Sequence, residues 1–144
     1  MDLTLEDAIV LATNAHRGQV DKAGHPYILH PLRVMLGVEA LYERMAAVLH
    51  DVVEDTRVTL PDLIDCGYPR EVTDAVDHLT RRTDETYVVF IDRCALNSVA
   101  RCVKIADVRD NLSPDRLALL PVETAVYLGR RYERALTRLL AVAV

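Results

Sequence analysis

The sequence predicts an all-α protein, a compact single-domain helical bundle of about seven or eight helices that spans residues 1–144. Two observations lead to this prediction. Apolar residues recur at helical spacing along most of the chain, and no segment reads convincingly as part of a sheet. In addition, 51% of the residues are apolar and no linker or internal repeat divides the chain, which is ample material for one buried core.

Capping residues, glycines and prolines set the expected boundaries of the first helices. The first helix should begin after its N-cap Thr4 and end near Arg17, because Gly18 follows. Two glycines and a proline within residues 18–26 predict a loop. The next helix is expected over residues 28–38.

A strongly apolar stretch over residues 42–54 predicts the third helix. A short helix should follow, with Thr59 as its N-cap, Pro61 in its first turn and its end at Gly67. The other helices are expected from Pro69 onward, over residues 87–96, over residues 100–112 with Pro114 as the terminator, and over residues 121–142, with a charged loop at residues 81–85.

Charge and the N-terminal pattern limit the classes of partner. A net charge of −5 offers no general basic surface, so we expect no nucleic-acid partner, although a small anionic ligand could meet a local cluster of Arg and Lys. The first residues are acidic and amphipathic, which predicts neither a signal peptide nor a membrane span. We therefore expect a cytoplasmic protein with a small-molecule partner and no membrane partner. The oligomeric state does not follow from the sequence.

Four ionisable residues, His50, Asp51, Glu54 and Asp55, interrupt the otherwise apolar helix predicted over residues 42–54. In a continuous helix, Glu54 lies one turn after His50 and Asp55 one turn after Asp51, so all four line one mouth. An adjacent imidazole and carboxylate suit Mn²⁺, Fe²⁺ or Zn²⁺ better than Ca²⁺. An isolated His-Asp pair is as readily a solvated helix end, because motifs this short recur by chance.

A metal site needs further ligands from elsewhere in the chain. His30 and Asp107 are the best candidates, because each lies at the edge of a predicted helix otherwise made for burial. His16, His25 and His78 are better explained as local structural residues, since they occupy a helix end, a turn and a packing position.

Four blocks of the sequence together resemble the hydrolase domain of RelA/SpoT proteins, within the HD superfamily. The blocks are AHRGQ at residues 15–19, GHPYILHP at 24–31, VLHDVVEDT at 48–56 and VKIADVRDNL at 103–112. They occur in the order found in that family, and the resemblance covers roughly residues 5–140. It implies a bundle of the HD-domain type.

The resemblance also implies an activity, namely metal-dependent removal of the 3′-pyrophosphate of guanosine tetra- or pentaphosphate (ppGpp or pppGpp), the alarmones of the stringent response. The products would be GDP or GTP and pyrophosphate, with Mn²⁺ as the usual metal. Because no nucleotidyl-transfer domain follows, we expect a free-standing small alarmone hydrolase. Position by position, the resemblance makes His30, His50, Asp51 and Asp107 metal ligands, Glu54 and Asp55 the catalytic pair beside the attacking water, and Asn111 a nucleotide contact.

Two departures from the family pattern concern basic residues. The basic pair that usually follows the first block is Asp21-Lys22 here, so only Lys22 remains, and the Arg that commonly follows Asn-Leu is Ser113. Substitutes for these phosphate contacts are expected among Arg81, Arg82, Arg93, Lys104 and Arg109. Two alternatives stay open: an HD-domain phosphatase for another nucleotide, such as a nucleoside monophosphate or NADPH, and a nucleotide-binding module without turnover.

Overall fold

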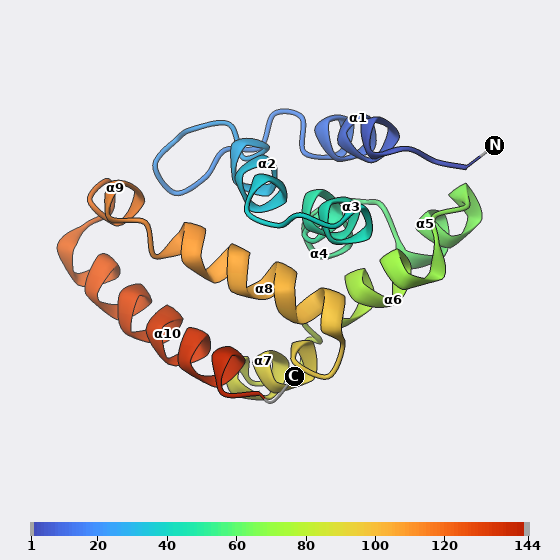
Figure 1. The fold of residues 1–144 in the computed structure, drawn as a ribbon. Coiled ribbons are helices and arrows are strands. Elements are labelled where there is room, and N and C mark those ends of the chain that lie inside the picture. The colour runs from blue at the N-terminus through green and yellow to red at the C-terminus, as the bar shows by residue number, and fades with distance from the viewer. Residues whose placement is uncertain (1, 143–144) are drawn as a thin grey trace.

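The computed structural model describes residues 2–142, and within this range the chain forms helices and no strand (Figure 1). The all-α prediction is therefore confirmed. An isolated β-bridge joins Val20 and Pro26 in the loop after the first helix. The helices are α1 (Leu5–Ala15), α2 (Leu29–Leu36), α3 (Leu41–Leu49), α4 (Val52–Asp55), α5 (Leu60–Cys66), α6 (Arg70–His78), α7 (Tyr87–Cys94), α8 (Ser98–Asn111), α9 (Pro114–Leu117) and α10 (Val122–Leu140).

Several helix ends lie where the capping residues predict them. The Thr4 hydroxyl accepts a hydrogen bond from the Asp7 backbone N–H, and Thr59 caps α5 in the same way. Gly67 ends α5 with φ at 96°, a left-handed conformation that glycine adopts without strain. The predicted end of α1 near Arg17 is wrong by two residues, because the chain already leaves the helix at His16.

The helix predicted over residues 42–54 is broken at His50 and Asp51 into α3 and α4. Asp51 has a φ of −103° and a ψ of 0°, outside the helical range. At the break the Ala47 carbonyl accepts the His50 backbone N–H at 3.3 Å, and it also accepts a hydrogen bond from the His50 ring at 2.6 Å. The apolar pattern continues across this point, which is why periodicity alone predicted one helix.

A second difference concerns the segment after α8. Pro114 was expected only to terminate a helix, but it also starts the single-turn helix α9, a position where proline is well tolerated. Together with the break at His50, this short helix explains why the described residues form more helices than the seven or eight predicted.

Helix α8 runs through the middle of the bundle, with α2, α3 and α6 on one side and α7 and α10 on the other (Figure 1). The main core lies between α8 and the N-terminal helices and includes Met45, Leu49 and Val103. A smaller apolar cluster, Ile91, Val108, Ala135 and Leu139, joins α7, α8 and α10. Within residues 2–142, no helix combines the length and apolar character needed to cross a membrane.

Candidate metal centre

Three separate segments bring the four predicted ligands to one place. His30 is the second residue of α2, His50 and Asp51 lie at the break between α3 and α4, and Asp107 lies in the C-terminal half of α8. The side chains of His30, His50 and Asp107 are almost completely buried, and that of Asp51 is 16% exposed. These residues are 77 positions apart at the extremes, so only the packing of α2 and α3 on α8 assembles them.

The donor atoms have the spacing of ligands around a single ion. His30 Nε2 lies 2.8 Å from Asp107 Oδ1, and His50 Nε2 lies 3.0 Å from Asp51 Oδ2 and 3.6 Å from Asp107 Oδ1. Ligand atoms that each lie about 2.1 Å from one ion are separated from one another by roughly 3 to 3.5 Å. His30, His50 and Asp107 therefore have the mutual spacing to hold one divalent cation, and Asp51 lies next to His50 in a second acidic group with Glu54 and Asp55.

The hydrogen bonds of the two imidazoles provide an independent test of this fit. The His50 Nδ1–H donates to the Ala47 carbonyl, and the buried Nε2 has no hydrogen-bond partner. The His30 Nδ1–H donates to Asp110 Oδ2 at 2.6 Å. Metal-bound histidines characteristically donate their second ring N–H to a carbonyl or carboxylate in this way, which leaves the other nitrogen free to coordinate. The Nε2 of His50, which is buried without a hydrogen-bond partner among the described residues, is likewise available to coordinate a metal ion.

The site concentrates negative charge in a buried place, which favours a bound cation. Burial raises the pKa of Asp107, but the Lys104 ammonium 2.6 Å away, the hydrogen bond from His30 and the nearby charge of His50 hold it well below 3.8. Burial lowers the pKa of His50, yet the neighbouring Asp51 and Asp107 raise it overall. These carboxylates thus draw a proton onto His50, and a divalent ion would satisfy the same attraction.

Glu54 and Asp55 lie at the mouth of this site, and each offers a carboxylate oxygen within 4.8 Å of Asp51. Burial, followed by the charges of Asp51 and Glu54, raises the pKa of Asp55 to about 6. Glu54 Oε1 accepts a hydrogen bond of 2.8 Å from the Arg81 backbone N–H, which fixes the direction of its carboxylate. Both side chains are only partly covered, reach solvent at the mouth and face the same cavity, so either can meet a water molecule there.

Tyr27 supports the centre from the loop before α2, a contact that sequence reasoning missed. Its hydroxyl donates a hydrogen bond to Asp51 Oδ2, and its ring packs 5.0 Å from that of His16. His16 in turn contacts Gln19, whose amide donates to the Asp55 carbonyl at 2.9 Å. The first sequence block therefore braces the segment that carries His50 and Asp51.

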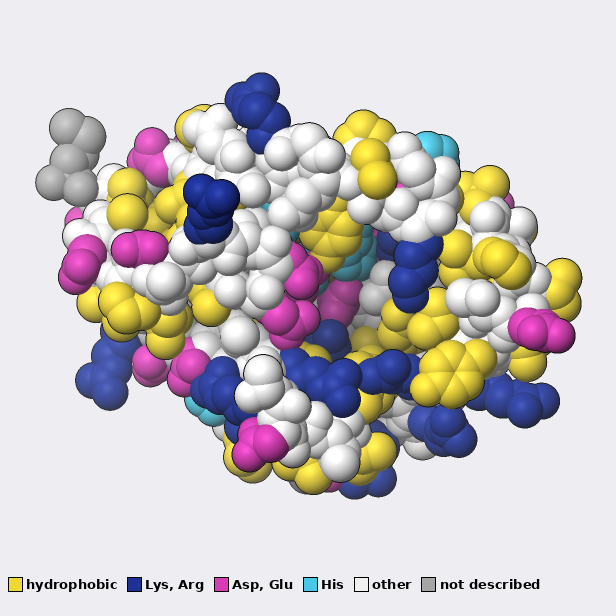
Figure 2. All heavy atoms as spheres, turned by 180° about the vertical axis from the view of Figure 1, so that it is seen from behind, with side chains coloured by type: hydrophobic (Ala, Val, Ile, Leu, Met, Phe, Trp, Pro, Cys, Tyr) yellow, Lys and Arg dark blue, Asp and Glu magenta, His cyan; other side chains and the backbone are white. Residues whose placement is uncertain are grey.

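A cavity of about 640 Å³ opens from the centre toward α7 and α10. We call it the main cavity. Figure 2 shows a hollow with histidine and acidic side chains inside it and Lys and Arg side chains around its edge. Its lining includes His30, Asp51 and Asp107 together with Glu54 and Asp55.

Four of the predicted substrate contacts, Lys22, Arg81, Lys104 and Asn111, also line the main cavity. These side chains differ, however, in how free they are to contact a substrate. The Lys104 ammonium is bound to Asp107 Oδ2 at 2.6 Å, and the Asn111 amide donates to Asp107 Oδ1 at 3.2 Å. Both residues therefore hold a candidate ligand in place.

The other predicted cations lie outside the main cavity. Arg82 forms an ion pair with Asp77 at 2.8 Å and is not part of the lining. Arg93 is paired with Glu85 at 2.7 Å, and Arg109 lies on the exposed side of α8. The sequence alone does not distinguish these arginines from those that face the cavity, and the fold does.

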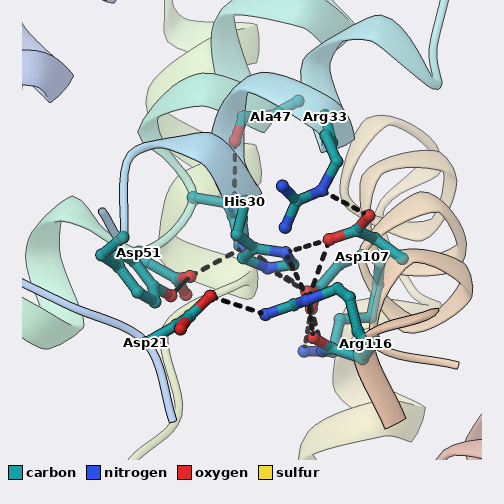
Figure 3. A network of polar contacts seen from close by, with 12 residues as sticks. Asp21, His30, Arg33, Ala47, Asp51, Asp107 and Arg116 are labelled. Carbon is teal, nitrogen blue, oxygen red and sulfur yellow. Dashed lines mark hydrogen bonds and ion pairs between the residues drawn. The ribbon is translucent and has the colours of Figure 1, made fainter. Parts of the chain in front are cut away.

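Arg116 on α9 is a further residue that sequence reasoning missed. Figure 3 shows its guanidinium between Asp21 and the polar groups around His30. Arg116 donates to Asp110 Oδ2 at 2.9 Å and to Asn111 Oδ1 at 2.8 Å, and it lies 3.9 Å from Asp21. Asp21, which breaks the expected basic pair, thus has a defined partner. A single Arg after a proline gave no signal that it would reach the site.

No family model matches the chain. Over 84 residues, 54% of the chain, it is 39% identical to the guanosine-3′,5′-bis(diphosphate) 3′-pyrophosphohydrolase of Vibrio cholerae. Over 63 residues, 41% of the chain, it is 44% identical to the bifunctional (p)ppGpp synthase/hydrolase SpoT of Escherichia coli. The matches cover 11% and 9% of these relatives, so the chain spans about a tenth of their length.

The fold is shared with a solved structure described as a metazoan ortholog of SpoT that hydrolyzes ppGpp and plays a role in starvation responses. The two superpose with a TM-score of 0.67 at 24% identity, over 94% of this chain and 92% of the other. The chain therefore shares the helical fold of this solved structure, and its sequence similarity to RelA/SpoT proteins is confirmed.

Proposed function

We propose that this protein is a metal-dependent phosphohydrolase that removes the 3′-pyrophosphate of guanosine tetra- or pentaphosphate, and that residues 1–144 act as one domain. The observation that carries the proposal is the buried cluster of two imidazoles and two carboxylates at one end of the main cavity. Similarity to proteins named as ppGpp hydrolases supports the choice of substrate.

In this proposal the divalent ion is held by His30, His50, Asp51 and Asp107. The mutual spacing of the first, second and fourth of these residues, the contact of 3.0 Å between His50 and Asp51, and the hydrogen bonds of the imidazoles support it. A metal ion there would act as a Lewis acid that polarises a phosphoryl oxygen and makes a nearby water more acidic. Mixed imidazole and carboxylate donors suit Mn²⁺, Fe²⁺ or Zn²⁺, and among these we propose Mn²⁺, because it is the metal that the resemblance to RelA/SpoT hydrolases implies. We also propose a cytoplasmic location and a small nucleotide, not a nucleic acid, as partner.

The carboxylates Glu54 and Asp55 would handle the proton of the attacking water. The oxygen of this water adds to the phosphorus that is attached to the 3′ oxygen. The bond between this phosphorus and the 3′ oxygen then breaks, and the 3′ oxygen leaves with a proton. Asp55, whose pKa lies at about 6, is suited to exchange protons near neutral pH. Lys22 and Arg81 are proposed phosphate contacts, while Lys104 and Asn111 hold Asp107. Arg82 is left out of the proposed site, because its guanidinium is paired with Asp77.

The experiment incubates Mn²⁺-loaded protein with a panel of nucleotides and separates the products by chromatography. The panel contains ppGpp, pppGpp, GDP, nucleoside monophosphates and NADPH. The proposal predicts that ppGpp yields GDP and pyrophosphate in equal amounts, and that EDTA stops the reaction. Release of inorganic phosphate from NADPH or a monophosphate, with ppGpp untouched, would overturn the substrate and keep the phosphohydrolase. No turnover of any nucleotide would favour a binding module.

A further inference from the structure

Three side chains, Arg81, Tyr87 and Arg131, form a wall of the main cavity and also border a second hollow. This hollow, of about 980 Å³, lies along α7 and α10, and we call it the α7–α10 groove. The three residues are the lining that the main cavity and the groove have in common. They therefore stand where the main cavity continues away from the metal centre.

The two arginines are oriented by the ring of Tyr87. The guanidinium carbon of Arg131 lies 3.8 Å from the centre of this ring, and that of Arg81 lies 5.7 Å from it. The Arg81 Nε–H also donates to the Glu85 carbonyl at 3.1 Å. An arginine stacked on an aromatic ring keeps its N–H groups available for a phosphate, and its orientation is fixed beforehand.

These arginines are also available to a ligand, unlike most cations of the main cavity. Lys104 is paired with Asp107, and Arg116 is paired with Asp110. Within residues 2–142, the side chains of Arg81 and Arg131 have no ion pair with a carboxylate. Each can therefore bind an anion without giving up an internal partner.

The hydroxyl of Tyr87 gives independent evidence, because it lacks a hydrogen-bond partner within residues 2–142. Its oxygen is buried and has no hydrogen-bond partner among the described residues, although the residue lines the main cavity. Buried polar groups are normally paired, so this phenol O–H calls for an acceptor atom. A phenol is protonated at neutral pH, and burial raises its pKa further, so the group is a proton donor. A phosphate oxygen is such an acceptor.

We propose that Arg81, Tyr87 and Arg131 form a second anion site of the main cavity, which holds the 5′-diphosphate of the nucleotide while the 3′-pyrophosphate lies at the metal centre. The inference rests on the proposed function. A nucleotide with two diphosphates carries its charge at two ends, and a protein of net charge −5 must meet the second end with local cations. Guanidinium groups suit this task, because they bind phosphate through two parallel hydrogen bonds.

The test compares two substrates that share the 3′-pyrophosphate and differ at the 5′ end, ppGpp and guanosine 3′-diphosphate with a free 5′-hydroxyl. Arg131→Gln should raise KM for ppGpp at least tenfold more than KM for the 5′-hydroxyl substrate. Tyr87→Phe keeps the aromatic ring and should have the same selective effect at a smaller size. Arg134→Gln is the matched control, since Arg134 lines the α7–α10 groove but not the main cavity, and it should show no selective effect.

The outcomes separate the two proposals. If wild-type protein hydrolyses both substrates and Arg131→Gln raises both KM values equally, the second anion site is overturned and the proposed function stands. If wild-type protein hydrolyses neither, the proposed function fails, and calorimetric titration with GDP and guanosine decides the second site. Arg131→Gln should then weaken GDP binding about tenfold more than guanosine binding. Equal loss, or no GDP binding to the wild type, overturns it.

Discussion

At the residue scale, the chemistry of single side chains was easier to predict than their partners. The unusual His-Asp pair inside an apolar stretch marked His50 and Asp51 as candidates, and the structure brings His30 and Asp107 to them. The supporting contacts came from far along the chain and gave no local pattern. Asp110, for example, lies 80 residues from His30, yet it accepts the hydrogen bond that fixes the ring.

Glu54 allows its charge to be separated from its structural role. Its Oε1 accepts the Arg81 backbone N–H, and a glutamine oxygen can accept the same hydrogen bond. Glu54→Gln should therefore keep the loop and the metal content but lower kcat by about 10²-fold, if the carboxylate moves a proton. Elemental analysis and steady-state kinetics measure the two effects. Glu71→Gln, in the first turn of α6, is the control, and an unaltered kcat in Glu54→Gln would remove Glu54 from the mechanism.

Asp55 predicts a pH-dependent cost to stability. Burial and the charges of Asp51 and Glu54 raise its pKa to about 6, above the value of 3.8 for an unperturbed group. The folded state then holds this proton more strongly than the unfolded state does, so stability falls as pH rises from about 4 to 6. Above this window the ionised Asp55 is destabilising, and below it the penalty disappears.

Asp55→Asn should accordingly raise the melting temperature of the metal-free protein at pH 8 and have little effect at pH 4. Thermal unfolding followed by circular dichroism in EDTA measures this difference. Adding Mn²⁺ at pH 8 should shrink the gain, because the ion offsets the repulsion between carboxylates. An equal gain at both pH values would contradict a charge-based explanation.

At the scale of elements, local signals predicted helix starts better than helix continuity. Thr4 and Thr59 mark N-termini through side-chain caps that the structure confirms. The break at His50 was missed because it depends on a ring-to-carbonyl hydrogen bond, which apolar periodicity cannot reveal. It changes the site as well, because a continuous helix would pair the Ala47 carbonyl with the N–H four residues on, whereas here this carbonyl accepts both the backbone and the ring N–H of His50.

The short helix α9 is held to the centre mainly through Arg116, which makes its role testable. Arg116 donates to Asp110 and Asn111, and these residues hold His30 and Asp107. Outer contacts of this kind orient metal ligands, and their loss typically lowers metal affinity by about 10- to 100-fold. Arg116→Ala should therefore weaken Mn²⁺ binding about tenfold, measured by competition with a fluorescent chelator.

A matched control for this variant lies on α8. Arg109 is exposed and makes no hydrogen bond or ion pair with its side chain among the described residues. Arg109→Ala should leave Mn²⁺ affinity near the wild-type value. Arg116→Ala with unchanged affinity would mean that α9 contributes nothing to the orientation of the ligands.

At the scale of the whole molecule, composition predicted the net charge but not its arrangement. The total of −5 argued against a general basic surface, yet the fold places Arg81 and Arg131 in the wall of the main cavity and Arg130 and Arg134 along the adjoining α7–α10 groove. On the other side of the cavity it buries Asp51 and Asp107 almost in contact with two histidines. The acidic side of the cavity suits a metal cation, and the side that carries arginines suits a polyanion.

The buried acidic centre couples metal binding to the stability of the entire bundle. Its ligands come from α2, α8 and the break between α3 and α4, so the complete set exists only when these helices are packed together. An ion that binds this folded state and not the unfolded chain raises the free energy of unfolding by about 2.7 kcal/mol when its concentration is 100 times its Kd. For a domain of this size, that corresponds to a rise in Tm of roughly 10 °C.

Mn²⁺ should therefore raise the Tm of the wild-type protein by roughly this amount, and EDTA should reverse the shift. His50→Gln keeps a side chain of similar volume but removes the imidazole, so it should lose both the shift and the bound metal. The control is His78→Gln, because His78 bonds to the Asp74 carbonyl on α6 and has no contact with the centre. Scanning calorimetry with and without Mn²⁺, together with elemental analysis, gives both readouts. A His50→Gln protein with the full Mn²⁺ shift would exclude His50 as a ligand, because the stabilising ion would then be bound elsewhere.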